Sequence, residues 1–186
     1  HINKTSIVSQ IIEDLSNDIT PAPGGIKLEN LKGKFLGGDI SGNIDIDTTT
    51  TPSGIETKIK LVDASIKSEA TEIKLTESNL NFLGTLPNNG SLPEGRANLE
   101  LRNIILQNDT HSSKLIANIT TETVSETLYI KEGFIRGINN EGISFTGEMN
   151  NSLNENRSVK LIFPEVQISN ALGIFSPLVP EAFREF

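Results

Sequence analysis

Apolar and polar residues alternate along much of this chain. Between Asp39 and Asp47, the isoleucines Ile40, Ile44 and Ile46 are separated by serine, glycine, asparagine and aspartate. A period of two places the isoleucines on one face of a β-strand and the polar residues on the other. The pattern therefore predicts a β-sheet with one apolar face.

The same alternation recurs through most of the sequence, between turns rich in glycine, proline and asparagine. No long helical pattern intervenes, which favours an antiparallel meander over β-α-β units. Strands are predicted at Ile26–Leu31, Lys34–Leu36, Asp39–Thr48, Ile55–Val62, Ala64–Ser68, Glu72–Thr76, Asn79–Leu83, Arg96–Leu106, Lys114–Thr121, Thr127–Lys131, Phe134–Ile138, Ile143–Met149 and Ser158–Phe163, with a short last one at Val166–Ile168.

Glycines inside two of these segments suggest that the sheet is bent. The segments 38–45 and 142–149 share a glycine-punctuated amphipathic pattern. A glycine within a strand often marks a bulge or a bend, and repeated bends give a strongly curved sheet. We predict a mainly β fold with a curved antiparallel meander sheet, forming an open half-barrel or groove.

Both ends of the chain are predicted to differ from the middle. Residues 1–20 are predicted to hold an amphipathic helix, because apolar residues fall on one helical stripe. Pro21 to Gly25 would end this helix, and residues 169–186 form a tail with a short helix or turn. The stripe consists of Ile7, Val8, Ile11, Ile12 and Leu15, and the tail carries the apolar anchors Leu172, Ile174, Phe175 and Leu178. Residues 1–186 are interpreted as one β-rich domain, with strands over 26–168.

Composition argues against several kinds of partner. The net charge is −8, and no cluster of lysine or arginine offers phosphate groups a local site, so nucleic acid is not an expected partner. Aromatic residues make up 5 % of the chain and tryptophan is absent, which disfavours stacking on sugars or bases. Without cysteine, disulfides and thiolate chemistry are excluded. Since His1 is not an initiator methionine, we expect the chain to be a processed or trimmed piece of a longer protein.

The residues that could carry chemistry are few. His111 lies in a polar turn beside Asp109 and Ser112, and we interpret it as a solvated loop histidine because neighbours in one loop rarely satisfy triad geometry. The carboxylates of Asp39, Asp45 and Asp47 invite a calcium hypothesis, but a straight strand spreads such ligands apart. We therefore predict no catalytic residue, no metal site and no cofactor, although a hydrolase with unrecognised carboxylates stays open as a weaker hypothesis.

The apolar face is the candidate functional surface that is left. If a second layer covers it, the face is ordinary core; if nothing covers it, it is a groove able to hold an acyl chain or a partner strand. The predicted groove residues are Ile40, Ile44, Ile46, Ile59, Leu61, Leu99, Leu101, Phe145, Leu161 and Phe163.

Several of these segments resemble a known family. The glycine-rich stretch 36–45 is similar to strands of AsmA-like proteins of the bacterial envelope. The stretch 92–104, followed by 143–149 and 158–164, resembles the type II secretion system protein N (GspN) family, and the resemblance extends from about Ile26 to Pro180. It implies a periplasmic protein anchored in the inner membrane, with a curved sheet and an apolar concave face. The family offers no catalytic residue to transfer.

The expected function is that of a non-enzymatic periplasmic component of a type II secretion or other envelope apparatus, acting by protein–protein contact. The alternative is a lipid-binding or lipid-transfer module with a hydrophobic groove. The expected partners are other secretion-apparatus or envelope proteins, or lipid acyl chains. Contact with the membrane is expected only through an anchor that lies outside this sequence.

Overall fold

A computed structural model of the chain describes residues 2–7, 10–67, 71–87, 91–108, 111–137, 142–150, 158–164, 166, 168–175 and 177. Within these residues the fold is a single antiparallel sheet and one short helix, α1 (Ile168–Phe175). The strands are β1 (Ile2–Ile7), β2 (Gln10–Ala22), β3 (Gly25–Phe35), β4 (Gly38–Asp47), β5 (Ser53–Lys67), β6 (Glu72–Leu86), β7 (Glu94–Gln107), β8 (Ser112–Val124), β9 (Thr127–Gly137), β10 (Gly142–Asn150) and β11 (Ser158–Ile162).

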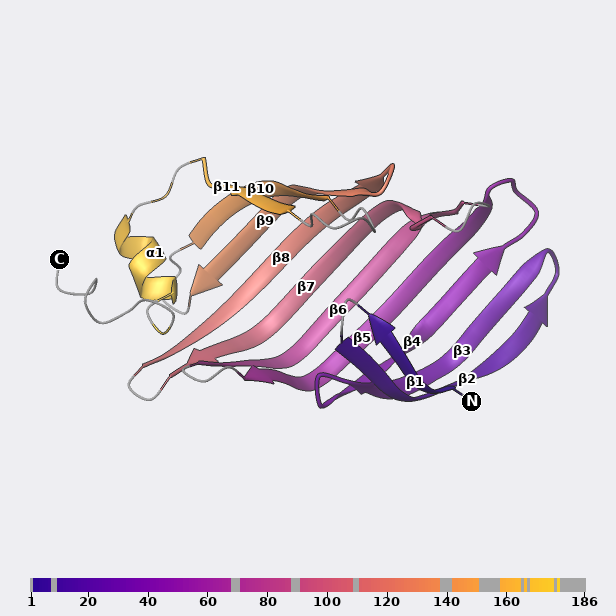
Figure 1. Cartoon of the computed structure of the whole chain (residues 1–186), viewed down its shortest axis with the longest axis horizontal. Coiled ribbons are helices and arrows are strands. Elements are labelled where there is room, and N and C mark those ends of the chain that lie inside the picture. The colour runs from indigo at the N-terminus through magenta and orange to yellow at the C-terminus, as the bar shows by residue number, and fades with distance from the viewer. Residues whose placement is uncertain are drawn as a thin grey trace.

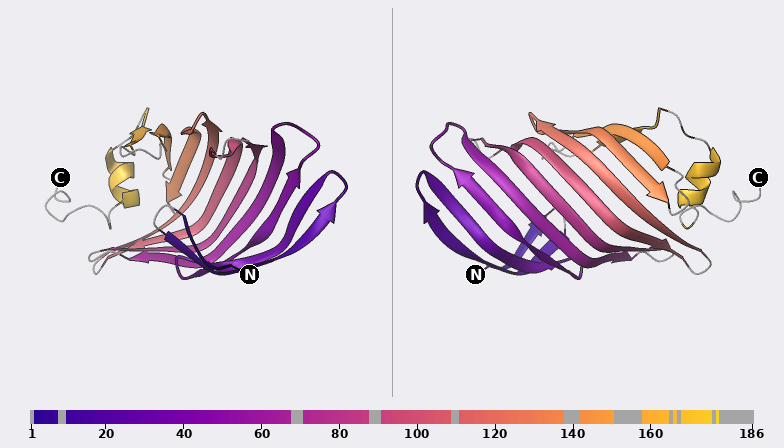
Figure 2. Two further views of the ribbon diagram at one scale, coloured as in Figure 1. Left: turned by 45° about the vertical axis from the view of Figure 1, so that its right-hand side comes forward. Right: turned by 180° about the vertical axis from the view of Figure 1, so that it is seen from behind.

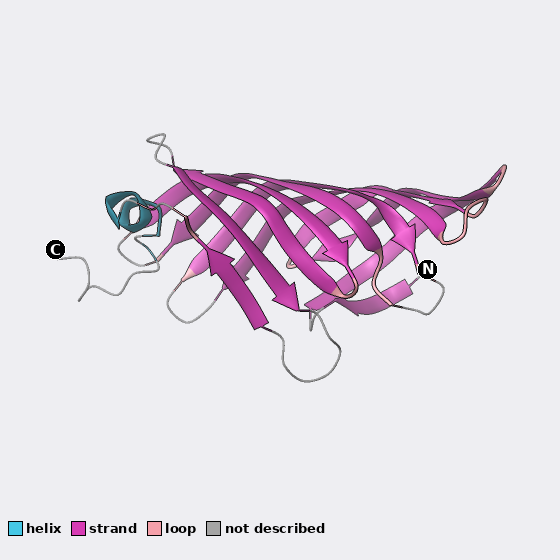
Figure 3. Cartoon of the chain, turned by 90° about the horizontal axis from the view of Figure 1, so that it is seen from above, coloured by secondary structure: helices cyan, strands magenta, loops and turns pink. Residues whose placement is uncertain are grey.

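The sheet is a meander that does not close. Each strand pairs with its neighbours in sequence, and β1 and β11 each have a single partner strand. The long tilted strands curl so that β1 and β11 come round toward the same side, as the views from the front, from behind and from above show (Figures 1, 2 and 3). The predictions of a mainly β fold and of an antiparallel meander are confirmed.

Four strands are longer than the alternation predicted, because each joins two segments that were predicted as separate strands. The two predicted strands Ile55–Val62 and Ala64–Ser68 form one strand, β5, and the segments predicted separately in β3, β6 and β9 are likewise continuous. In β5 the apparent break is Asp63, whose φ is +56°. A single residue in the left-handed conformation moves the following apolar residues one position out of the alternation. In the sequence this break looks like the end of a strand, but the pairing of β5 with β6 continues across it.

Four such residues, which we call the left-handed Asx positions, recur along the sheet. Each has a φ between +51° and +56° and stands inside an apolar–x–Asx–apolar segment, at residues 12–15, 28–31, 61–64 and 101–104. Aspartate and asparagine tolerate this conformation better than other residues with a Cβ. At three of the four the strand register shifts, so apolar residues three apart stay on one face. The four positions are Asp14, Asn30, Asp63 and Asn103.

The predicted N-terminal helix is wrong. Residues 2–7 and 10–22 form a β-hairpin in which Ile7 lies opposite Gln10 and Thr5 opposite Ile12. The sequence misleads because the apolar step from Ile12 to Leu15 has the i, i+3 spacing of a helix, whereas in the structure it spans the left-handed Asp14. Pairing with β3 along most of β2 favours the strand over the helix.

The helix α1 covers one part of the sheet. Ile174 is 2 % exposed and packs with Ile104, Leu115 and Ile143, while Ala171 and Phe175 pack against the same cluster. The predicted last strand at Val166–Ile168 is wrong, since Ile168 begins α1. Leu178 lies outside the described residues. Among the described residues, no helix has the length and apolar character needed to cross a bilayer.

Candidate functional surface

Strand register brings apolar residues of many strands onto one face, because residues directly opposite in adjacent strands share a face of the sheet. Ile40 on β4 lies opposite Leu61 on β5, and the row continues through Ser78 on β6 to Leu101 on β7. The next row joins Ile59 to Leu80, Leu99, Ile119 and Gly133 and ends at Phe145 on β10. A third row joins Ile44, Thr57, Phe82, Ala97, Thr121 and Ile130. We call this surface the apolar face.

The ten predicted groove residues are distributed over this face. Strand register places the predicted residues of β4, β5, β7 and β10 on the apolar face. Leu161 on β11 lies opposite Gly147 of β10. Phe163, which follows β11, packs its ring at 5.8 Å from that of Phe145. Phe145 is 5 % exposed, whereas Leu161 and Phe163 are more than 40 % exposed. The other seven are half-buried.

Exposure varies systematically over the apolar face. Under α1 the face is buried, as Leu115 at 4 % exposure shows, and toward the N-terminal end of the sheet, on β2 and β3, Ile12 and Leu31 of the same face are each 6 % exposed. Between these two zones Ile59, Leu99 and the other members of the central rows stay half-buried. Among the described elements, α1 packs against β8, β9 and β10. The rows on β4, β5 and β6 lie away from that helix, and their apolar side chains are less buried than those in its core cluster.

The apolar face carries no charged residue at its described register positions in β3–β10. Charges lie on the opposite face, where directly opposed or diagonal strand positions form ion pairs. Lys34 Nζ lies 2.5 Å from Asp39 Oδ1, Lys27 Nζ lies 3.7 Å from Asp45 Oδ1, and Lys131 Nζ lies 2.9 Å from Glu122 Oε2. We call this second surface the polar face.

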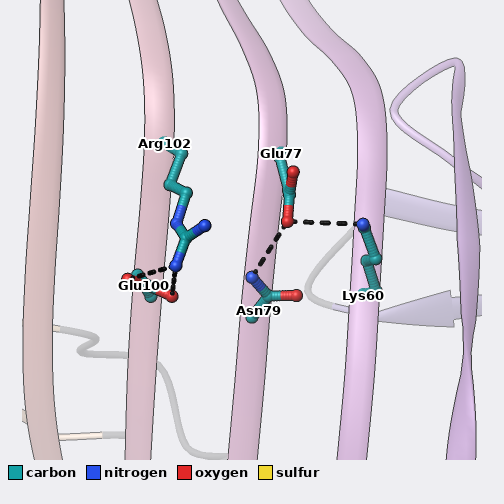
Figure 4. A network of polar contacts seen from close by, with 5 residues as sticks. All are labelled: Lys60, Glu77, Asn79, Glu100 and Arg102. Atoms are coloured by element: carbon teal, nitrogen blue, oxygen red, sulfur yellow. Dashed lines mark hydrogen bonds and ion pairs between the residues drawn. The ribbon is translucent and has the colours of Figure 1, made fainter.

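A group of five residues at the centre of the polar face shows how the charges are arranged (Figure 4). Glu77 accepts a hydrogen bond from Asn79 at 3.2 Å and forms an ion pair with Lys60 at 3.3 Å. Arg102 forms an ion pair with Glu100 at 2.9 Å. The hydrogen bond from Asn79 and then the lysine ammonium lower the pKa of Glu77. Exposed pairs of this kind contribute little stability, but they keep this face hydrated and its charges off the apolar face.

The other residues singled out in the sequence lie on or near the polar face. The carboxylates of Asp39 and Asp45 face lysines of β3 and do not converge on one another. Asp47 accepts hydrogen bonds from the backbone and side chain of Thr49 in the loop after β4, and these bonds lower its pKa. The described residues contain no group of three or more histidines or acidic residues close enough to hold a metal ion. His111 closes a turn with Asn108, whose Oδ1 accepts from the His111 backbone at 2.7 Å.

Glycines shape the apolar face where neighbouring strands approach closely. A Cβ at Gly133 would collide with the ring of Phe145, which covers this glycine from the next strand. At Gly42, the glycine inside β4, a Cβ would meet the Lys58 carbonyl and Ile59 of β5. Glycine is therefore needed at both positions, because neighbouring strands approach too closely there for a Cβ, as happens in bent sheets.

Sequence reasoning missed part of the apolar face. Leu80 and Phe82 stand in the central rows but were not among the predicted residues, although their alternation with Asn79 and Asn81 was a usable signal. Leu28 and Leu31 were missed because they are three apart. Only the left-handed Asn30 between them brings both to the same face.

The polar face also has a shallow hollow of about 280 Å³ beside Leu83, a residue that is 67 % exposed. It is lined from β5 to β8 by residues that include Lys58, Asn81, Arg96 and Asn98. The cations in this lining already have partners, since Lys58 pairs with Glu56 and Arg96 with Glu122. The hollow therefore lacks a free charge that would select a ligand.

Comparison of the chain with models of protein families, with curated proteins and with solved structures finds no match.

Proposed function

We propose that this chain is a non-enzymatic lipid-binding module that holds an acyl chain in a groove formed by its apolar face. The observation that carries the proposal is the central stretch of that face, which is mostly apolar, uncharged and half-buried between two buried zones. The curl of the sheet makes this stretch the floor of an open half-barrel. The resemblance to AsmA-like proteins leads us to place the module in the bacterial periplasm.

The chemistry of the face suits a saturated chain. Backbone donors and acceptors on the groove floor are used in the sheet ladder, so a ligand without hydrogen-bonding groups leaves none of them unsatisfied. Each methylene removed from water contributes about 0.8 kcal/mol. Burying about ten methylenes would supply about 8 kcal/mol, which exceeds the low end of the cost of association. The rows are mostly leucine and isoleucine, with Thr57, Ser78 and Thr121 as uncharged polar members and Phe82 as the one aromatic of the central rows, a composition that favours an acyl chain over a sugar ring.

Two substitutions on β7 test this proposal as a matched pair. Leu99→Asp places a carboxylate in the central row of the apolar face, and Asn98→Asp places the same side chain one residue away on the polar face. We expect Leu99→Asp to weaken binding of a fluorescent fatty acid at least tenfold, because a charge in an apolar site must be desolvated. Asn98→Asp should leave the affinity unchanged.

Circular dichroism of each variant separates loss of the site from loss of the fold. If Leu99→Asp unfolds the chain, Ile44→Ser on β4 gives a milder test of the same face. Native mass spectrometry of the purified protein should detect bound phospholipid or fatty acid. Equal affinity in the wild type, Leu99→Asp and Ile44→Ser would contradict the proposal, as would a wild type that binds no fatty acid.

A second function is favoured by a separate observation at the sheet edge. Leu161, Ile162 and Phe163 on and after β11 are each more than 40 % exposed, and among the described strands β11 pairs with β10 alone. Exposed apolar edge strands are sites at which another strand can be added. This edge supports a role in protein–protein contact, and the resemblance to GspN proteins leads us to propose a type II secretion or other envelope apparatus as the setting. Ile162→Lys should abolish capture of such a subunit while leaving fatty-acid binding intact.

A further inference from the structure

The hollow beside Leu83, which we call the polar-face hollow, lies between two rows of side chains on the polar face. Its strands, β5 to β8, each pair on both sides and stand in the middle of the sheet (Figure 1). Thr57, Phe82 and Ala97, whose side chains belong to the apolar face, contribute the floor between the rows. One row contains Lys58, Asn81, Asn98 and Thr120, directly opposite one another, and the other contains Glu56, Leu83 and Arg96.

Three members of the first row are uncharged and form what we call the neutral row: Asn81, Asn98 and Thr120. They stand on adjacent strands, which are about 4.8 Å apart, so the row extends over about 10 Å. All three residues are exposed, and none of their side chains hydrogen-bonds to another described residue. An amide and a hydroxyl can each both donate and accept. The neutral row therefore presents a line of unused donors and acceptors.

The charged residues of the hollow favour an uncharged ligand. Lys58 Nζ lies 2.7 Å from Glu56 Oε1, and Arg96 Nε lies 3.3 Å from Glu122 Oε1. A phosphate or carboxylate ligand would have to compete with these carboxylates for the cations, and the net charge of −8 on the chain would oppose its approach. A neutral ligand leaves both ion pairs in place.

Leu83 adds an apolar surface beside the neutral row. Its side chain is 67 % exposed on a face that otherwise carries charged and polar residues at this point. A sugar ring combines hydroxyl groups around its rim with C–H groups on its faces, and so matches both features. The volume of about 280 Å³ lies below the range of about 300–1,000 Å³ for sites of drug-sized ligands, and it suits a single ring.

The position of the hollow favours a sugar over a peptide. An extended peptide gains most of its affinity from main-chain hydrogen bonds at the edge of a sheet. In β5 to β8 the backbone groups are used in pairing on both sides, so they offer a peptide nothing over the hollow. A sugar needs only the side-chain amides and hydroxyl that the neutral row supplies.

We propose that the polar-face hollow binds one neutral sugar unit of an oligosaccharide. Hydroxyl groups of the sugar exchange hydrogen bonds with Asn81 and Asn98, and one face of its ring rests on Leu83. Because Leu83 offers no aromatic face for stacking, we expect a dissociation constant of about 1 mM. This site lies on the opposite face of the sheet from the proposed lipid groove and does not depend on it.

Nuclear magnetic resonance of the ¹⁵N-labelled protein tests the site at this affinity. We expect maltotriose, cellotriose or chitotriose, which are uncharged trisaccharides, to shift the side-chain amide signals of Asn81 and Asn98. Asn98→Ala should weaken binding about fivefold, since it removes hydrogen bonds at the centre of the neutral row. Asn118→Ala is the matched control, because Asn118 is an exposed asparagine of the polar face outside the hollow, and it should keep the wild-type affinity.

Leu83→Ala separates a sugar from other neutral ligands that bind through hydrogen bonds alone, and it should weaken trisaccharide binding about threefold. Equal affinity in the wild type, Asn98→Ala and Leu83→Ala would overturn the proposed site. So would a wild type whose Asn81 and Asn98 signals shift with none of the three trisaccharides, or shift with acetyl-trialanine amide instead. Each of these failures would leave fatty-acid binding to the apolar face untouched.

Discussion

Replacing Asn103 by valine perturbs one left-handed Asx position with little other change. Its φ is +51°, and its backbone carbonyl accepts a hydrogen bond from Thr76 Oγ1 that a substitution retains. Holding a residue with a Cβ in the left-handed region costs about 1–2 kcal/mol, and a β-branched side chain is a poorer fit than asparagine. We expect Asn103→Val to lower the free energy of unfolding by about 1–2 kcal/mol. In a domain of this size the melting temperature would fall by about 2–8 °C.

Thermal and urea unfolding of three variants measure this effect. Asn103→Gly should stay within about 0.5 kcal/mol of the wild type, because glycine adopts positive φ without strain. Asn118→Val, on a regular and exposed stretch of β8, should be neutral or slightly stabilising because valine favours strands. If Asn103→Val proved as stable as Asn118→Val, the left-handed conformation of residue 103 would not be what keeps Leu101 and Ile104 on the same face of the sheet.

Three further predictions concern packing and charge. Gly133→Ile should cost about 1–3 kcal/mol of unfolding free energy, because its side chain would displace the ring of Phe145. Ile143→Ala, at 2 % exposure, should cost about 2–5 kcal/mol, whereas Ile66→Ala, at 50 % exposure, should cost much less; urea titration compares the two. Hydrogen bonds from Lys131 and then from Arg96 lower the pKa of Glu122. The ionised carboxylate therefore stabilises the fold when the pH is above its unfolded-state pKa. That stabilisation is lost as the pH falls through its folded-state pKa. The difference in stability between the wild type and Glu122→Gln should therefore be present at neutral pH and shrink in acid; a difference that is constant with pH would contradict this.

Much of the sheet was predictable from period-two alternation, as in β4, where Ile40, Ile44 and Ile46 indicated both the strand and its apolar face. The left-handed positions were not. The apolar–x–Asx–apolar pattern of Leu101 to Ile104 recurs at Ile116 to Ile119, yet Asn118 lies in regular pairing and, of the two asparagines, Asn103 is the left-handed one. Local sequence does not distinguish the two cases, because the difference lies in how each strand pairs with its neighbours.

The candidate surface was predictable to a similar extent. The ten residues proposed from the sequence were chosen by alternation, and register places those in the paired strands on one face. Their differing exposure was not predictable: Phe145 is buried and Leu161 is open, although both occupy comparable alternating positions. Exposure depends on which strand or helix lies across the residue, and a one-dimensional pattern does not contain that information.

The sequence by itself determined that this chain forms antiparallel strands with one aliphatic and one charged face, because side chains on a strand alternate with a period of two. Only the tertiary structure decided that residues 2–7 pair with residues 10–22 as β-strands and that apolar residues three apart share a face. It also decided that α1 covers one end of that face while the centre stays half-buried. The physical reason is that strand pairing and helix docking join residues far apart in the chain, and the energy of those contacts outweighs local preference.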